Sequence, residues 1–384
     1  MSRRAVFAVG LGQCLNWGVL YYAFAVLMLP VSRELGVDSW WVTGAFSAAL
    51  LTSAALSPLV GRWTDRGHGP SVMVGGGVSA VVLLVAWTML PGLAALYVVW
   101  LGLGACMAAT LYEPAFAIVA RAMPSDERLR ALALVTVIGG LASTIFLPLT
   151  DLLARTLGWR GALVVLALLL AVSTLLTHLA LRGLPPKPVE RSSPQAGDAP
   201  TGPSPLFGWA LAVFAFGSFA SAGLTANLVP ALAVTQVTAS NAALLGGVLG
   251  VMQLPGRLLL SMGALSTSAI RLVMVSLLLQ AAGFLALSAA HSTLLVAAAL
   301  IVFAMGAGLA TLARPHLLQS HFERHRAGQL NGRLARWQHL ARAAGPVAAA
   351  SAATVVGYGA VLGALGALFV ALIAVWPLAV ARGR

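Results

Sequence analysis

Long apolar segments fill nearly the whole of this 384-residue chain, and arginine returns in every second connection between them. Of the 23 basic residues, 20 fall on one side of this alternation and three, Arg33, Arg155 and Arg160, on the other. Basic loops are not readily carried across a bilayer, so short arginine-rich loops stay on the cytoplasmic side. The alternation therefore predicts a protein that crosses the membrane many times, and it predicts the topology as well.

The composition excludes a water-soluble fold. Hydrophobic residues make up 60% of the chain, charged residues 9%, and the mean hydropathy is +0.93. The net charge of +13 lies in short loops beside the apolar segments, which indicates contact with anionic membrane lipids and no nucleic-acid partner. Cys14 and Cys106 both lie inside apolar runs without metal or redox spacing. We expect no cleavable signal peptide, because the first apolar run leads directly into another span.

A helix needs about 20 apolar residues to cross the hydrocarbon core, so the chain has room for about twelve spans. We predict an all-α integral membrane protein with both termini in the cytoplasm. The expected spans are 5–29, 41–61, 72–90, 94–119, 131–153, 160–181, 207–231, 242–263, 269–289, 293–313, 335–355 and 359–381.

Residues 182–206 are rich in proline, serine and charge, and such a segment neither spans a membrane nor packs a core. We expect this cytoplasmic linker to separate two six-helix bundles, 1–181 and 207–384. Short motifs recur in order in the two halves, about 195 residues apart. The pairs are Gly61-Arg62 with Gly256-Arg257, Ala120-Arg121 with Ala313-Arg314, and Gly158-Trp159 with Gly357-Tyr358. Two parallel repeats with a substrate path between them are typical of secondary transporters.

The loop after the second span, residues 61–69 (GRWTDRGHG), carries a glycine, then Asp65-Arg66, then a second glycine at Gly69. This pattern resembles the signature loop of the major facilitator superfamily, and the similarity covers essentially the full length of the chain. It departs at its end, where Pro70-Ser71 stand in place of the usual basic residues. The resemblance implies a transporter that alternates access, works as a monomer and needs no cofactor.

Shorter runs resemble two groups within that family. Residues 17–24 (WGVLYYAF), 34–37 (ELGV) and 44–47 (GAFS) resemble bacterial members close to the monocarboxylate and oxalate–formate porters. Residues 111–117 (LYEPAFA) resemble bacterial efflux members found with metalloid-resistance functions. Both interpretations stay open.

The resemblance also implies a cytoplasmic gate. In the family, the loop aspartate ties the second-to-third loop to the start of the eleventh helix when the cytoplasmic side is closed. The positive end of a helix dipole favours such a carboxylate. The corresponding gate residues here are Gly61, Asp65, Arg66, Arg333 and Arg336.

Very few charged residues lie at membrane depth, where burying a charge costs several kcal/mol and function is the default explanation; Glu113, Asp151 and Arg342 are the ones we single out. Glu113, well inside the fourth span, is the candidate to load and release a coupling proton. The alternative is a permanent salt bridge to Arg121. Asp151, near the outer end of the fifth span, has Arg155 one turn later, and we expect a structural pair.

Arg342 lies about two turns into the eleventh span and is the candidate anion-binding residue. Its guanidinium offers a planar fork to a carboxylate and stays charged. The alternative is that it snorkels to the cytoplasmic interface beside Arg336 and His339.

The resemblance implies that polar residues of the first, fourth and seventh spans face a central cavity. We expect the substrate-binding residues Asn16, Trp17, Tyr21, Tyr112 and Asn227 to join Arg342 there; further polar residues on these spans are Gln13, Tyr22, Thr110 and Thr225. A few polar groups in an apolar pocket suit a small, partly apolar solute. Helices that are apolar all round do not reveal which of these residues face inward.

Other classes are excluded by missing motifs. The single lysine, Lys187, is followed by proline, so the chain has no phosphate-binding GxxxxGK[ST] loop. The sequence contains no catalytic constellation that would indicate an enzyme. It also contains no soluble output domain that would indicate a sensor. Four histidines gather near the tenth-to-eleventh loop without metal-site spacing, and we expect them on a solvated cytoplasmic face. They are His316, His321, His325 and His339.

We therefore predict a secondary transporter of the bacterial cytoplasmic membrane that couples a small organic solute, a carboxylate, to protons by alternating access. The competing hypothesis is proton-driven efflux of toxic amphipathic or metalloid compounds. The sequence leaves the substrate and the direction of transport open.

Overall fold

The computed structural model describes residues 1–89, 92–182, 205–233, 237–253, 268–321 and 324–376. Throughout these ranges the secondary structure is helical, joined by short turns. The first half contains α1 (Arg3–Trp17), η1 (Gly18–Tyr22), α2 (Ala23–Leu35), α3 (Ser39–Trp63), η2 (Thr64–His68), α4 (Gly69–Trp87), α5 (Leu93–Thr110), α6 (Tyr112–Ala122), α7 (Ser125–Gly140) and α8 (Ala142–Leu181). The second contains α9 (Pro205–Ala226), α10 (Leu228–Ala233), α11 (Ala239–Met252), α13 (Ala269–Ser288), α14 (Thr293–His321) and α15 (Arg324–Ala374).

The helix order agrees with the predicted count of about twelve spans. The long helix α8 turns at Gly158, where φ is 71°, and α15 turns at Gly357, where φ is 79°, so each contains two spans. Only glycine adopts this left-handed conformation without strain, which explains why the repeated glycine motif stands at both turns. Residues 183–204 of the predicted linker and most of the second half of the eighth span lie outside the described residues, and α9 already begins at Pro205.

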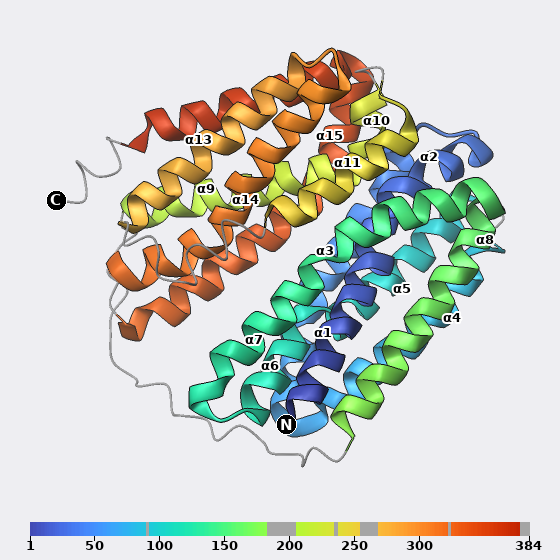
Figure 1. The fold of residues 1–384 in the computed structure, drawn as a ribbon, viewed down its shortest axis with the longest axis vertical. Helices are drawn as coiled ribbons and strands as arrows, with labels where there is room; N and C mark the ends of the chain where they lie inside the picture. Colours follow the sequence, from blue (N-terminus) through green and yellow to red (C-terminus); the bar gives the residue numbers. More distant parts are fainter. Residues whose placement is uncertain (90–91, 183–204, 234–236, 254–267, 322–323, 377–384) are drawn as a thin grey trace.

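Figure 1 shows the helices in two groups, α1 to α8 (the first bundle) and α9 to α15 (the second bundle). The bundles meet where α2, α10 and the top of α15 lie together, and they spread apart toward the end that holds the N-terminus. We call that spread end the basic end, because it also carries the arginines of the η2 loop. The opposite end, with the turns at Gly158 and Gly357, is the far end.

Hydrogen bonds join the bundles in their far halves. Thr144 Oγ1 donates to the carbonyl of Gly247 at 2.8 Å, and the backbone N–H of Val347 donates to Ser47 Oγ at 3.2 Å. A side chain at Gly247 would press on the backbone of α8, so the missing Cβ permits this close approach. Small residues at such crossings are the usual packing device in lipid, where the hydrophobic effect between helices is absent.

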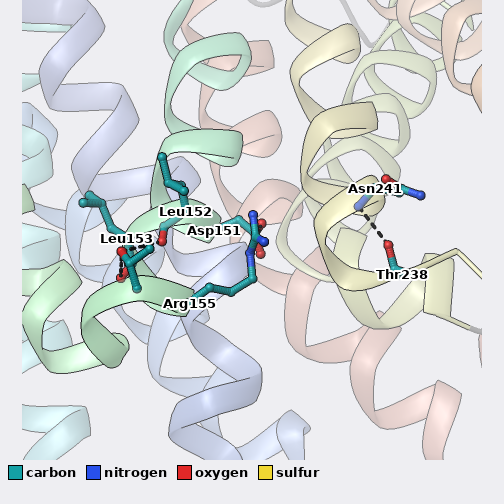
Figure 2. A network of polar contacts seen from close by, with 7 residues as sticks. Asp151, Leu152, Leu153, Arg155, Thr238 and Asn241 are labelled. Carbon is teal, nitrogen blue, oxygen red and sulfur yellow. Dashed lines mark hydrogen bonds and ion pairs between the residues drawn. The ribbon is translucent and has the colours of Figure 1, made fainter.

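The predicted pair near the outer end of the fifth span is confirmed. Arg155 Nε donates to Asp151 Oδ2 at 2.9 Å, and the Asp151 side chain is buried. Figure 2 shows this pair on α8 facing the start of α11, where Thr238 accepts a hydrogen bond from the backbone N–H of Asn241 at 3.2 Å. A buried carboxylate needs a partner, and Arg155 supplies one from the same helix.

Candidate transport cavity

The fourth span is broken at its centre, and its sequence explains the break. Pro114 has no N–H to donate to the carbonyl of Thr110 four residues earlier, so the helical ladder is interrupted there. Leu111 is extended, with φ −79° and ψ −162°, and separates α5 from α6. The break places Glu113 in the first turn of α6, where the helix dipole favours a carboxylate.

The first span satisfies the carbonyl that this break leaves free. Gln13 Nε2 and Asn16 Nδ2 both donate to the oxygen of Thr110, at 2.8 and 3.1 Å. Ser173 Oγ in turn donates to Asn16 Oδ1 at 2.6 Å. Asn16, predicted to bind substrate, is only 4% exposed, and both polar atoms of its side chain hold α1 to α5 and α8. In this structure it supports the cavity wall from behind.

A cavity lies between the bundles beside that break. Its lining residues are Trp17, Tyr21, Leu50, Ser53, Met107, Leu111, Glu113, His339 and Arg342. The empty space between these side chains measures ≈ 400 Å³, a volume that includes open solvent. Most of the wall comes from the first bundle, while α15 of the second bundle contributes His339 and Arg342.

The charged groups of the cavity come from opposite bundles. His339 Nε2 lies 3.6 Å from Glu113 Oε1, and Arg342 follows His339 by three residues on the same face of α15. The charges on Arg342 and Arg314 also act on His339. The structure therefore places Glu113 and Arg342 on the wall of one cavity.

Sequence reasoning placed His339 with the solvated histidines, and that interpretation was wrong. His316 and His321 are exposed on α14, whereas the side chain of His339 is 34% exposed and points at Glu113. Spacing within α15 contained a usable clue, because His339 and Arg342 share a helix face. The contact with Glu113, 226 positions earlier, follows only from the packing of the two bundles.

Trp17 and Tyr21 are the aromatic rings that line the cavity, and further rings pack against Trp17. The Trp17 ring centroid lies 5.3 Å from that of Tyr21 and 5.2 Å from that of Tyr112, and Tyr112 stacks on Phe116 at 4.8 Å. The π-helical turn η1 begins directly after Trp17, and such turns are frequent at functional sites. Trp17 Nε1 is buried without a hydrogen-bond partner among the described residues, so it has a donor to offer.

Asn227, the predicted binding residue of the seventh span, lies at the break between α9 and α10. It is 1% exposed, and its Nδ2 donates to the carbonyls of Gly223 and Pro346 at 2.9 and 3.0 Å. Its Oδ1 accepts from Tyr358 at 3.2 Å. The Tyr358 hydroxyl also lies near Ser39 of the first bundle. Asn227 is thus bonded toward the far end and is not among the residues that line the cavity.

The predicted gate residues lie at the basic end in an open arrangement. Asp65 Oδ1 lies 3.7 Å from Arg121 Nη2, and Arg121 Nη1 donates to the carbonyl of Thr64 at 2.6 Å. Arg121 was the alternative salt-bridge partner expected for Glu113, but in the structure Arg121 pairs with Asp65. Arg333 lies over the Phe207 ring at 5.5 Å. The remaining gate residues are exposed: Gly61, Arg66 and Arg336.

This fold, two helix bundles around a central cavity, defines a membrane transporter rather than an enzyme. The comparison with protein families makes the assignment specific, since residues 6–346 match the Major Facilitator Superfamily. The chain belongs to this family, as its signature loop indicated.

Curated relatives include monocarboxylate transporter 11 from Homo sapiens, which is 32% identical over 227 residues, covering 53% of this chain and 45% of the human protein. The mouse protein of the same name, from Mus musculus, is 32% identical over 197 residues, 45% of this chain and 42% of its own length. The matches thus span less than half the length of these relatives.

Solved structures share the fold at low identity. A bacterial homologue of the human lysosomal transporter Spinster, in an inward-facing and occupied conformation, gives a TM-score of 0.79 at 16% identity, over 98% of this chain and 96% of that one. The human organic anion transporter MFSD10 gives a TM-score of 0.69 at 20% identity, over 97% of this chain and 98% of that one. The nucleoside transporter NupG gives 0.75 at 14% identity, over 99% of both chains.

Proposed function

We propose that this protein is a proton-coupled secondary transporter of small organic monocarboxylates. The observation that carries the proposal is that Arg342 and Glu113, from opposite bundles, line one cavity. A guanidinium at membrane depth is costly unless an anion balances it, and a carboxylate fits its planar fork. The 32% identity to monocarboxylate transporter 11 over about half of this chain supports the same substrate class.

The rest of the cavity suits the body of such a solute. Leu50, Met107 and Leu111 offer apolar contact, and Trp17 and Tyr21 offer flat aromatic faces. Apolar walls with a few polar groups are the usual composition of small-molecule sites. The wall therefore favours a carboxylate with a short apolar or aromatic tail over a strongly hydrated dicarboxylate.

Transport proceeds in this proposal by rocking of the bundles 1–181 and 207–384 in a bacterial cytoplasmic membrane. The protein works as a monomer, and both termini and the basic end face the cytoplasm, as the arginine loops predict. The spread helices at that end then correspond to an inward-open state. Closing would bring Asp65 toward the start of the eleventh span near Arg333 and Arg336, the gate that the signature loop implies.

The test uses purified protein and a panel of candidate solutes. Thermal stabilisation is measured with lactate, benzoate, succinate, tetraphenylphosphonium and arsenite, followed by uptake into proteoliposomes under an imposed pH gradient. We expect benzoate and lactate to stabilise the protein and to accumulate. Glu113→Gln should abolish proton-driven accumulation while leaving solute binding and exchange largely intact.

An efflux protein for cationic toxicants behaves differently. There Glu113 contacts the solute itself, beside the aromatic faces that attract cations. Tetraphenylphosphonium would then stabilise the protein, and Glu113→Gln would destroy that binding. This result, or retained proton-driven uptake in Glu113→Gln, would contradict the proposed role of Glu113.

A further inference from the structure

The contact between His339 and Glu113 joins the two moving parts of the transporter at the cavity. Glu113 lies in the first turn of α6, and its side chain is 54% exposed to the open space. His339 lies on α15 and approaches it to 3.6 Å, the separation of an ion pair. Histidine is the side chain that ordinarily changes charge near neutral pH, so this contact has an ionic form and a neutral form that differ by one proton.

The groups around His339 make its charge depend on Glu113. On α15 Arg342 lies one turn away, and on α14 Arg314 adds a second positive charge. Arg314 itself donates to Gln338 Oε1, a neutral partner. The charge on Arg342 also acts on the hydroxyl of Tyr21 in η1. Among the described residues that act on His339, Glu113 is the negative group, and it opposes the two arginines.

We propose that His339 and Glu113 form one shared proton-binding site that spans the bundles, with His339 as the group that takes the proton. This inference rests on the proposed proton coupling and assigns its site. With the proton bound, imidazolium and carboxylate attract each other across the cavity and draw the bundles together. Once the proton leaves, the neutral imidazole releases Glu113, and the attraction between the bundles is lost.

The same geometry links the proton to an anionic solute. An anion on Arg342 cancels the positive charge that lies one turn from His339, and it thereby favours the protonated imidazole. Binding free energies are reciprocal, so the proton must favour the anion by the same factor. The coupling therefore passes through two neighbouring residues of α15, Arg342 and His339, and does not require contact between the solute and Glu113.

Proton binding at His339 can be followed directly in the purified full-length protein without any solute. Histidine labelled with ¹⁵N gives ring signals for the seven histidines, and the signal missing from His339→Gln belongs to His339. We expect this signal to titrate in one step. Glu113→Gln should lower its proton affinity about tenfold or more, because an opposite charge within ion-pair distance is lost. Arg342→Gln should raise the affinity, because a like charge is lost.

Two controls separate this site from general effects. Glu34→Gln removes a carboxylate at the far end, bonded to Arg160, and should leave the midpoint of His339 unchanged. His291→Gln removes an exposed loop histidine and should leave proton-driven uptake of benzoate unchanged, whereas His339→Gln should remove its pH dependence. Circular dichroism and thermal melting show whether each variant is folded.

The outcomes are distinct. An unmoved midpoint in Glu113→Gln, or a His339 signal that does not titrate, overturns the shared site. A shifted midpoint without transport of any carboxylate supports the shared site and rejects the proposed solute. Should His339→Gln fail to fold, the signal is assigned with His339→Asn, and the Glu113→Gln titration decides the question alone.

Discussion

The two bundles carry equal positive charge and very unequal negative charge. Each has ten arginines, but seven of the ten acidic residues lie in the first bundle and one, Glu323, in the second. The arginines are set by topology, since every cytoplasmic loop needs them in both halves. The acidic residues are free to differ, so their distribution reports how each bundle uses its charges.

The first bundle neutralises its charges internally. Arg160 Nη1 donates to Glu34 Oε2 at 2.6 Å, and Trp159 Nε1 donates to the same oxygen at 2.7 Å. The pairs Asp65–Arg121 and Asp151–Arg155 also lie wholly within this bundle. The Glu34–Arg160 and Asp65–Arg121 contacts tie different helices of this bundle together, whereas Asp151–Arg155 lies within α8.

The second bundle leaves its cavity cations to be balanced from outside. Arg314 is bonded to the neutral Gln338, and Arg342 faces the cavity, where the nearest described carboxylate is Glu113 of the other bundle. A cation at membrane depth without a partner in its own bundle is costly. Under the proposed function, this difference means that the first bundle supplies the carboxylate and the second supplies the cation that would recognise an anion.

The largest effect is expected from replacing Arg342, which tests this division between the bundles. Arg342→Ala should weaken binding of benzoate about 10- to 100-fold, because hydrogen bonds to a charged group contribute about 1.5–3 kcal/mol. Arg342→Lys should keep part of the affinity, since the charge remains and the planar fork is lost. Isothermal titration calorimetry measures both constants.

Arg336→Ala is the matched control for this prediction. Arg336 is exposed on the same helix, two turns earlier, and its loss should leave the affinity unchanged. Equal binding by Arg342→Ala and the wild type would contradict the assignment of anion recognition to the second bundle.

An intermediate effect is expected at Asp65. In this open arrangement its carboxylate pairs with Arg121 at 3.7 Å and is 61% exposed, so the pair contributes little to stability. Asp65→Asn should instead slow turnover several-fold and shift the bundles toward the open basic end, because the closed gate loses its carboxylate. Spin labels at Arg62 and Ser320 report the distance between the bundles at that end.

Asp38→Asn provides the comparison, since Asp38 is exposed at the far end just before α3. Asp38→Asn should change neither the distance between the spin labels at the basic end nor the turnover rate. Identical distances and rates in Asp65→Asn and the wild type would show that Asp65 is only a solvated loop charge.

The smallest expected effect concerns the far-end closure at Tyr358. Tyr358→Phe removes the hydroxyl that donates to Asn227 and lies near Ser39 of the first bundle, a loss of about 0.5–1.5 kcal/mol. The far end should then open in a larger fraction of molecules, seen as a longer distance between labels at Leu157 and Asn241.

Tyr97→Phe is the matched variant inside the first bundle, where Tyr97 donates to the carbonyl of Trp41 at 2.9 Å. It should lower the melting temperature without changing the distance between the bundles. A similar distance change in both variants would mean that the hydroxyl of Tyr358 acts on stability alone.

The sequence determined the membrane class, the order of the spans and the repeat. These follow from apolar length and from the arginine loops, which act locally and need no tertiary contact. It also determined the pair Asp151–Arg155, since two residues four positions apart on a helix are neighbours in any fold. The break at Pro114 was not among the predictions, although its cause is local, because a missing N–H interrupts the ladder wherever the helix lies.

Only the tertiary structure decided which side chains share the cavity. Asn16 and Asn227 read as binding residues in sequence, yet the first bonds to the carbonyl freed by the helix break and the second to Tyr358. His339 read as a loop-side histidine, yet it meets Glu113. The physical reason is that helices apolar around their whole circumference carry no periodicity that marks an inner face. Contacts across the bundles depend on how two helices rotate and slide against each other, and small residues such as Gly247 fix that geometry only once the chain has folded.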